Sequence, residues 1–370
     1  MGTIDEMVVP GPLAWSQPVP PAARRRWRWV AVAVVTATVL AAAIVVEVPY
    51  YAIAPGTARQ VNDLIAVPAE LANPPEGRVL LATVALRRVS ILEALLGWLD
   101  DDTAVVPEDE VLGDQNRREF RRENREQIAD SKQVAVLVAL RRLGFPVQER
   151  GQGGLVVEVT PASPATGHLV AGEVITAVDG QPTSLKQEVV DAVRARRPGE
   201  QVRLGVTSVD GAGREEVVTL ASPPPAAAAG GGFLGVALRT KAQVFDLPFE
   251  VTIDSGTIGG PSAGLAFTLG LLDALTRGEL TGGATVAVTG TIAPDGTVGD
   301  VGGVAQKTAA VRAAGADYFL VPPGELEQAR ARAGKRLQVR AVASVDEAIE
   351  TLAALGGEPI PAAAPPMAAA

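Results

Sequence analysis

The pattern of apolar and polar positions predicts alternating strands and helices over the last third of the chain. Residues 249–254 (FEVTID) and 284–292 (ATVAVTGTI) are rich in β-branched side chains, which is typical of strands. Between them, residues 261–276 (PSAGLAFTLGLLDALT) are apolar on nearly every face of a helix, so we expect that helix to be buried. A second helix (GGVAQKTAAVRAAGA) ends at Gly315, and the strands DYFLVP and LQVRAV and a helix over 344–355 complete the pattern.

A second, β-rich unit is predicted between residues 146 and 222. Its first two strands lie at 155–159 and 173–178 and are separated by Pro- and Gly-containing turns. A helix (LKQEVVDAVRA) and two closing strands (QVRLGVTSV and REEVVTL) follow. The Pro-, Ala- and Gly-rich residues 223–232 are expected to form a linker to a last domain at 233–355.

The segment at 50–145 precedes this unit. VLLATV at 79–84 reads as a buried strand, and SILE at 90–93 is a capping box that opens a short helix. We expect the acidic residues 100–110 to form a solvated loop and a long helix to follow over 114–143.

The N-terminal region contains one candidate membrane span. Residues 29–46 carry no charge and extend about 27 Å as a helix, close to the hydrocarbon thickness of a bilayer. Trp27 and Trp29 lie at one end of this stretch and Tyr50 and Tyr51 at the other, as interfacial anchors do. Four arginines lie among residues 24–28. The positive-inside rule then predicts a cytoplasmic, disordered tail at 1–28 and an extracytoplasmic body. A cleaved signal peptide, with the alanines at 41–43 as its cleavage site, is the alternative.

Composition excludes several classes of function. The net charge of -9 gives no basic face for a nucleic acid, and no GxxxxGK[ST] loop is present for a nucleotide. The chain has no cysteine and a single histidine, His168, so thiolate catalysis, disulfides and two-histidine metal sites are excluded. We expect no cofactor and no metal. His168 falls in a turn of the β-rich unit, where a structural role is expected.

Two residues stand out in the last domain. Ser262 follows a Gly-Gly-Pro turn at the start of the buried helix, where a serine is ordinarily a helix cap. Lys307 shares a 3-4-3 helical stripe with Val304, Val311 and Ala314, where a core side chain is expected. Burial would lower the pKa of its amine and make it a possible general base, whereas a lysine that snorkels to water would keep its charge.

Taken together, these residues resemble the proteolytic domain of the Lon family. GGPSAG is followed 45 residues later by the lysine of GGVAQK, and TGGATVAVTGTIAPDGTVGDVGGVAQKTAA follows the family's pattern between them. The resemblance implies an α+β fold of the ribosomal protein S5 domain 2-like type and a Ser262–Lys307 dyad that hydrolyses peptide bonds through an acyl-enzyme. It also implies that Thr289 orients the lysine. Gly260, Pro261 and Ala263 are expected to support the serine, because a helix start offers free N–H groups to an oxyanion.

The β-rich unit resembles a PDZ domain of the bacterial type, through Ser163-Pro164-Ala165 and the run from Gly172 to Gly180. The resemblance implies that the unit binds a protein or peptide, often at its C-terminus, as an added strand. The expected receiving residues are Gly153, Gly154, Leu155 and Val156.

The whole chain therefore looks like a membrane-anchored, PDZ-containing Lon-like serine endopeptidase. We expect the PDZ-like unit to be inserted in the protease domain, whose first strand and helix would lie in 50–145; an independent domain there is the alternative. Three features depart from the family's pattern. Gly259 occupies a position where many ATP-dependent relatives carry an acidic residue, and Asp300 occupies one where they often carry proline. The ATPase module of those relatives is missing from this sequence. We therefore expect cleavage of unfolded or membrane-proximal segments without ATP. A non-catalytic scaffold and a peptide-binding adaptor are the alternative functions. The resemblance to the family also implies a possible homo-oligomer. Residues 356–370 are expected to form a disordered tail.

Overall fold

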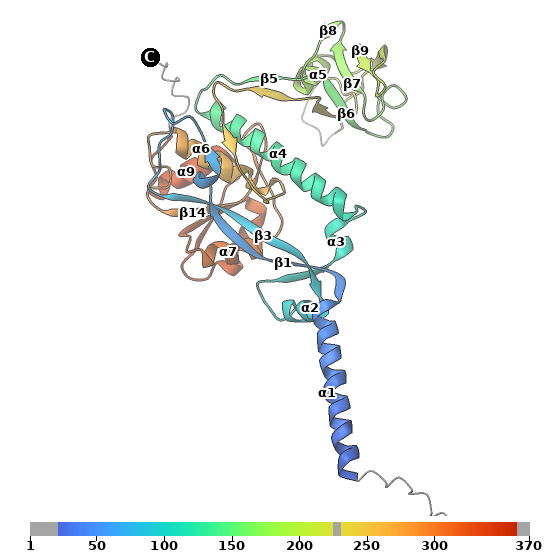
Figure 1. Ribbon diagram of the computed structural model, residues 1–370. Helices are drawn as coiled ribbons and strands as arrows, with labels where there is room; N and C mark the ends of the chain where they lie inside the picture. Colours follow the sequence, from blue (N-terminus) through green and yellow to red (C-terminus); the bar gives the residue numbers. More distant parts are fainter. Residues whose placement is uncertain (1–20, 225–230, 361–370) are drawn as a thin grey trace, which may run out of the picture. The chain divides into compact units, whose positions relative to one another are not determined.

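The computed structural model describes residues 21–224 and 231–360, and these residues form two compact units (Figure 1). Of the described residues, the first unit contains those up to Pro55 and Val84–Asn116, and the second contains Gly56–Thr83 and those from Arg117 onward. The expected tail at 1–20, part of the linker (225–230) and residues 361–370 lie outside the described residues.

The first unit begins with a long helix and continues as strands. Its elements are α1 (Pro21–Val45), the first half of β1 (Glu47–Gln60), the second half of β3 (Arg78–Ser90), α2 (Ile91–Gly97), β4 (Ala104–Pro107) and α3 (Glu108–Leu112). The capping box predicted for α2 is present, because Ser90 and Glu93 each accept a hydrogen bond from the other's backbone N–H. The acidic stretch at 100–110 is not simply a loop, since β4 pairs with β1 from Tyr50↔Pro107 to Ile53↔Ala104.

The second unit contains a parallel sheet with helices on both faces. Within it, β3, β14 (Thr285–Val288), β17 (Tyr318–Val321) and β18 (Gln338–Ala341) run parallel, and β1 lies beyond β3. The helices are α4 (Arg117–Arg142), α6 (Gly264–Leu275), α7 (Val304–Ala313), α8 (Leu326–Ala333) and α9 (Val345–Ala354).

Alternate strand residues fill two separate cores. Val286 and Val288 of β14 pack with residues of α4, α6 and α9, whereas Ala287 packs on the other face with residues of α7 and α8. Both faces of the strands are buried, which explains why they read as continuous apolar runs. Strand β3 precedes the PDZ-like region in the chain and β14 follows it, so segments from both sides of that region form one sheet.

The PDZ-like region forms a second sheet with its own core. Its strands lie in the order β10 (Gly213–Thr219), β9 (Gln201–Thr207), β7 (Val174–Val178), β6 (Gly154–Val159) and β11 (Val236–Thr240), and α5 (Lys186–Arg194) packs on them. The structure differs from the predicted boundary at residue 222, because β11 lies beyond the linker and pairs with β6. Residues 236–240 therefore belong to this sheet rather than to the last domain.

Several shorter elements differ from the sequence pattern. The strand expected at 249–254 is reduced to β13 (Thr252–Ile253), and that at 284–292 is broken at Thr289 and Gly290. Helix α8, with the sequence LEQARARA, was not predicted, because its apolar stripe consists only of alanines and a leucine. The remaining elements are η1 (Asn62–Leu64), β2 (Ile65–Ala66), β5 (Gln148–Arg150), β8 (Gln181–Pro182), β12 (Val244–Asp246), η2 (Pro261–Ala263), β15 (Thr291–Ile292), β16 (Val298–Gly299) and η3 (Pro323–Glu325).

Candidate active site

Ser262 lies in η2, the short turn that leads directly into α6. Its side chain makes no capping hydrogen bond in η2 or α6, so the helix-cap reading of this serine is not supported. Gly260, immediately before the turn, has a φ of 83°, a conformation that glycine adopts without a steric penalty. The N–H of Ser262 precedes the first intrahelical hydrogen bond of η2, as the first N–H groups of any helix do.

Helix α4 holds this turn from outside. Asn124 accepts a hydrogen bond from the Gly260 N–H through its backbone oxygen (3.0 Å), and Ser131 Oγ donates to the Pro261 carbonyl (3.0 Å). The two residues stand seven apart on one helical face with Ile128, which packs into the core. Sequence reasoning missed both, although polar residues on an apolar stripe are the signal that could have identified them.

Lys307 is buried in the first turns of α7. Only 2% of its surface is exposed, so its side chain does not snorkel to water. Burial lowers the pKa of its amine from 10.5 to about 8, although the negative charge of Glu325 opposes this shift. A substantial fraction of this lysine is therefore neutral at mildly alkaline pH, which a general base requires.

Thr289 connects the lysine to the serine turn. Lys307 Nζ donates to Thr289 Oγ1 (3.1 Å), and Thr289 Oγ1 in turn donates to the Ser262 carbonyl (3.3 Å). The same carbonyl accepts the Gly290 N–H (3.1 Å), at the break between β14 and β15. No hydrogen bond joins the Ser262 hydroxyl to Lys307 within the described part of the chain; in enzymes without substrate such bonds are often long.

The unusual positions Gly259 and Asp300 have different surroundings. A Cβ at Gly259 would lie 3.3 Å from the Cβ of Asn124, so α4 approaches this backbone closely. Asp300 is exposed and lies against Gly324, beside η3. The carboxylate that acts on the pKa of Lys307 is Glu325 instead, a residue that no local sequence pattern singles out.

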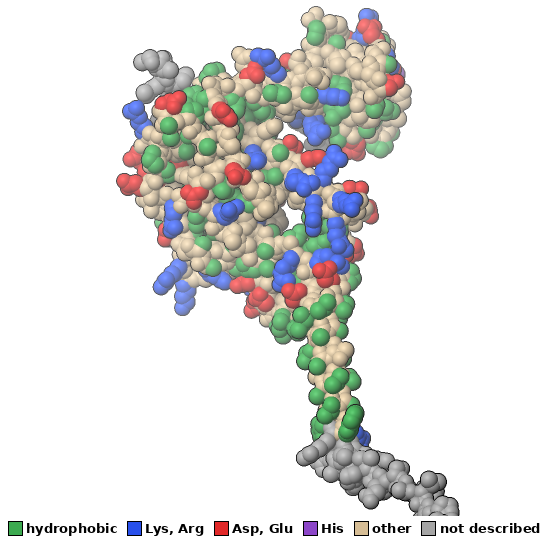
Figure 2. Space-filling model, viewed as in Figure 1, with side chains coloured by type: hydrophobic (Ala, Val, Ile, Leu, Met, Phe, Trp, Pro, Cys, Tyr) green, Lys and Arg blue, Asp and Glu red, His purple; other side chains and the backbone are tan. Residues whose placement is uncertain are grey.

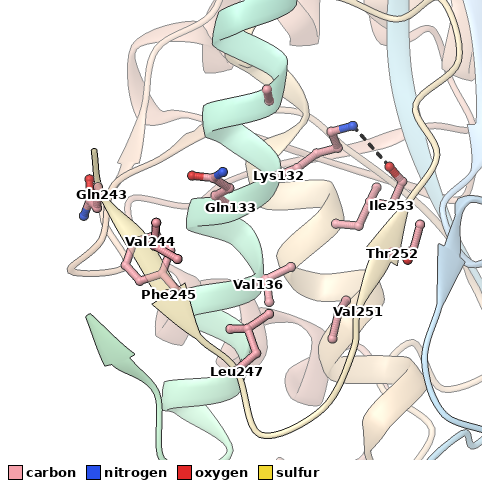
Figure 3. Close-up of a pocket in the computed structure, with 11 residues that line it drawn as sticks. Lys132, Gln133, Val136, Gln243, Val244, Phe245, Leu247, Val251, Thr252 and Ile253 are labelled. Atoms are coloured by element: carbon pink, nitrogen blue, oxygen red, sulfur yellow. Dashed lines mark hydrogen bonds between the residues drawn. The ribbon is translucent and has the colours of Figure 1, made fainter. Parts of the chain in front are cut away.

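A pocket of about 430 Å³ lies between α4 and the chain that leads to the serine turn (Figure 3). Its walls are mainly apolar, and Val136, Leu247 and Val251 lie close together in it. Lys132, next to Ser131, lines one side and donates to the Ile253 carbonyl (3.2 Å). The pocket therefore offers an apolar surface with one ammonium group and is joined to the serine turn through α4.

The PDZ-like sheet has its free edge at a different strand from the one predicted. Of the predicted receiving residues, Gly153 precedes β6, and Gly154, Leu155 and Val156 lie in β6. Strand β6 pairs with β7 on one side and with β11 on the other. Neither edge of β6 can therefore receive another strand. Strand β11 is the edge strand beside α5. A pocket of about 140 Å³ separates the two elements and is lined by Val189, Val190, Val193 and Arg194 of α5 and by Gly232, Phe233, Leu234, Gly235, Val236 and Leu238.

His168 has a structural environment. Its Nδ1 lies 3.0 Å from Glu216, and its carbonyl accepts a hydrogen bond from Arg214 (2.8 Å). Arg214 also pairs with the buried Glu173, and this hydrogen bond is the main reason why the pKa of Glu173 is lowered. The histidine therefore links the segment between β6 and β7, in which it lies, to β10.

The geometry thus gives a serine turn tied through Thr289 to a buried lysine, and a separate sheet with its own core and a free edge. Comparison with family models specifies the class. The Lon protease (S16) C-terminal proteolytic domain matches residues 241–355, and the PDZ domain matches residues 141–215. The chain thus carries a serine-protease domain of the Lon type and a PDZ domain, as the sequence predicted.

Two solved structures that are similar to part of the chain are PDZ domains. That of an SdrC-like protein from Listeria innocua is 27% identical, covers 23% of this chain and 92% of its own, and has a TM-score of 0.21. The corresponding domain from Listeria monocytogenes is 24% identical, covers 24% and 87%, and has a TM-score of 0.22. The comparison with curated proteins finds no match.

One helix is long and apolar enough to cross a membrane within the described residues. It is Trp27–Val45 of α1, with a mean hydropathy of 2.1 and no buried residue, close to the span predicted at 29–46. Among the residues that the structure describes (21–224 and 231–360), no group of three or more side chains is placed to hold a metal ion.

Proposed function

We propose that the chain is a membrane-anchored serine endopeptidase that uses Ser262 as nucleophile and Lys307 as general base. The observation that carries the proposal is the chain of hydrogen bonds from Lys307 through Thr289 to the Ser262 carbonyl. The lysine is buried, has a lowered pKa and is tied to the element that carries the serine. A lysine kept in the core only for packing would gain nothing from this arrangement, since burying an amine costs free energy.

The chemistry follows from these positions. Neutral Lys307 accepts the proton of the Ser262 hydroxyl while the serine oxygen attacks a substrate carbonyl. The N–H groups at the start of η2 stabilise the oxyanion, and the protonated lysine then donates to the leaving amine. Water hydrolyses the acyl-enzyme with Lys307 again as base. Thr289 holds the amine in place throughout and is a positioning residue.

Substrates are proposed to be unfolded or flexible protein segments, cleaved without ATP. The pocket lined by Val136, Leu247 and Val251 would accept apolar side chains of such a segment. The groove between β11 and α5 would bind an extended peptide C-terminus at the free edge of the PDZ sheet. We further propose that α1 spans the cell membrane with the arginines near its start in the cytoplasm, which places both domains outside.

The catalytic proposal is tested on the full chain in detergent, with casein as substrate and no nucleotide. Ser262→Ala and Lys307→Ala should each abolish cleavage and labelling by a fluorophosphonate. Lys335→Ala, at an exposed lysine, is the matched control and should retain both. Retained cleavage in either dyad variant would overturn the mechanism. Absence of both cleavage and labelling in the unmodified chain would favour a non-catalytic scaffold.

A peptide-binding test addresses the PDZ groove. Leu238→Glu places a charge in the pocket beside α5 and should weaken binding of peptides with apolar C-termini at least tenfold. Val217→Glu is the control, because Val217 is a half-exposed residue of β10 at the opposite edge of the sheet. Equal weakening by both substitutions would contradict the proposed groove.

A further inference from the structure

Helix α2 in the first unit has an outward face that is apolar instead of polar. Leu95, Leu96, Trp98 and Leu99 are 50%, 57%, 58% and 83% exposed, respectively. Ile91 and Leu95 are four residues apart and so occupy one face of α2, while Trp98 and Leu99 lie in the turn that follows the helix. Figure 2 shows hydrophobic surface in this region, beside the end of α1. The face of a surface helix is ordinarily polar where it meets water.

The opposite face of α2 is already used for packing. Ala94 belongs to a small core with Ala52 of β1 and Val89 of β3. A Cβ added at Gly97 would lie 2.6 Å from the side chain of Val105, so this side of the helix lies directly on β4. The exposed leucines and the tryptophan therefore cannot be buried by turning the helix.

Two contacts join α2 and the turn after it to the residues that directly follow α1. The Ile91 N–H donates to the carbonyl of Val46, one residue beyond the end of α1 (3.2 Å). The ring of Trp98 packs edge-on against Tyr50, with ring centroids 6.0 Å apart. The span Trp27–Val45 is about 28 Å long as a helix, close to the thickness of the hydrocarbon layer, so its end lies at the membrane interface. Helix α2 must therefore lie at the same depth.

We infer that the outward face of α2, with the Trp98-Leu99 turn, inserts into the headgroup–acyl boundary of the bilayer that α1 spans. The inference rests on the proposed membrane anchor. Tryptophan and tyrosine are the side chains enriched at this depth, and leucines beside them enter the acyl region. The polar turn that follows ends the insertion, since Asp100 accepts hydrogen bonds from the Asp102 N–H and the Thr103 hydroxyl. The first unit would thus be held on the membrane at two points, α1 and α2.

The test places a single tryptophan at the predicted depth. Trp15, Trp27 and Trp29 are replaced by phenylalanine in the full chain, which leaves Trp98 as its only tryptophan. The protein is reconstituted in phosphatidylcholine vesicles with brominated acyl chains. Bromine should quench Trp98 emission roughly twofold, and aqueous iodide should quench it little. The matched control carries Trp98→Phe and Val209→Trp, at an exposed turn residue of the PDZ domain, and should show the reverse.

A second variant separates the effect of α2 from that of α1. Leu95→Ser, Leu96→Ser and Leu99→Ser together remove apolar surface from exposed positions, so the fold should persist. Quenching of Trp98 by bromine should fall to the control value, while the chain stays in the membrane after carbonate extraction. Unchanged quenching would overturn the role of this face. Quenching of Trp98 by iodide in the chain that keeps its leucines would also overturn the inference. Protection from both quenchers would overturn it in favour of a protein surface that covers α2. Release of the chain by carbonate would overturn the anchor itself and, with it, the position of α2.

Discussion

Deprotonation of Lys307 should control the rate at which Ser262 reacts. Its pKa of about 8 leaves roughly 1% of the amine neutral at pH 6 and about half at pH 8. The rate of acylation should therefore rise about 50-fold between these pH values and level off above pH 9. An unshifted lysine with a pKa of 10.5 would give a rise that continues beyond pH 10.

The assay measures the second-order rate of fluorophosphonate labelling of the full chain, because this reaction reports attack by the Ser262 oxygen without the later steps of hydrolysis. Lys307→Arg is the informative variant, since arginine keeps the positive charge and stays protonated at every pH tested. It should abolish the labelling. A flat profile from pH 5 to 9, or labelling of the arginine variant at the rate of the unmodified chain, would refute the assignment of Lys307 as the base.

Three further substitutions test the electrostatics of the catalytic unit. Glu325→Gln removes the negative charge that raises the pKa of Lys307, so the midpoint of the labelling profile should move below pH 8. Lys307→Met should increase the free energy of unfolding at pH 7 by up to roughly 3 kcal/mol, because burying the charged amine of Lys307 destabilises the native state. Urea titrations followed by circular dichroism measure this change. That gain should shrink as the pH rises from about 8 and should be lost above 10.5, where the lysine is neutral in both the native and the unfolded state. Asp273→Asn should stabilise by a similar amount above pH 6, because burial raises the pKa of the Asp273 carboxyl to about 6. The difference should disappear as the pH falls below 3.8, where the carboxyl is protonated in both the native and the unfolded chain. A loss of stability in either variant would contradict the desolvation argument.

Local sequence signals identified the elements that carry the candidate dyad. A serine after Gly-Gly-Pro, a lysine on an apolar stripe and the spacing between them predicted a Lon-type domain, and the family comparison supports this domain. Such signals are readable because helix caps and helical periodicity depend on residues close together in the chain. The buried state of Lys307 was predictable for the same reason.

Other features depend on contacts between residues that are far apart in the sequence. Asn124 and Ser131 hold the serine turn from a helix more than 130 residues earlier, and Glu325 acts on Lys307 from a separate loop. No local pattern encodes these distances. The same holds for the PDZ edge strand, where the choice between β6 and β11 depended on the pairing of strands on opposite sides of a linker.

The sequence by itself therefore determined the classes of the two domains, the candidate nucleophile and base, and the apolar helix near the N-terminus. The tertiary structure decided which strand of the PDZ sheet is free, which carboxylate sets the charge around Lys307, and where the apolar face of α2 points. The physical reason is that periodicity shows which residues a helix or strand can bury. Only packing against other elements decides whether a face meets the core, water or a membrane.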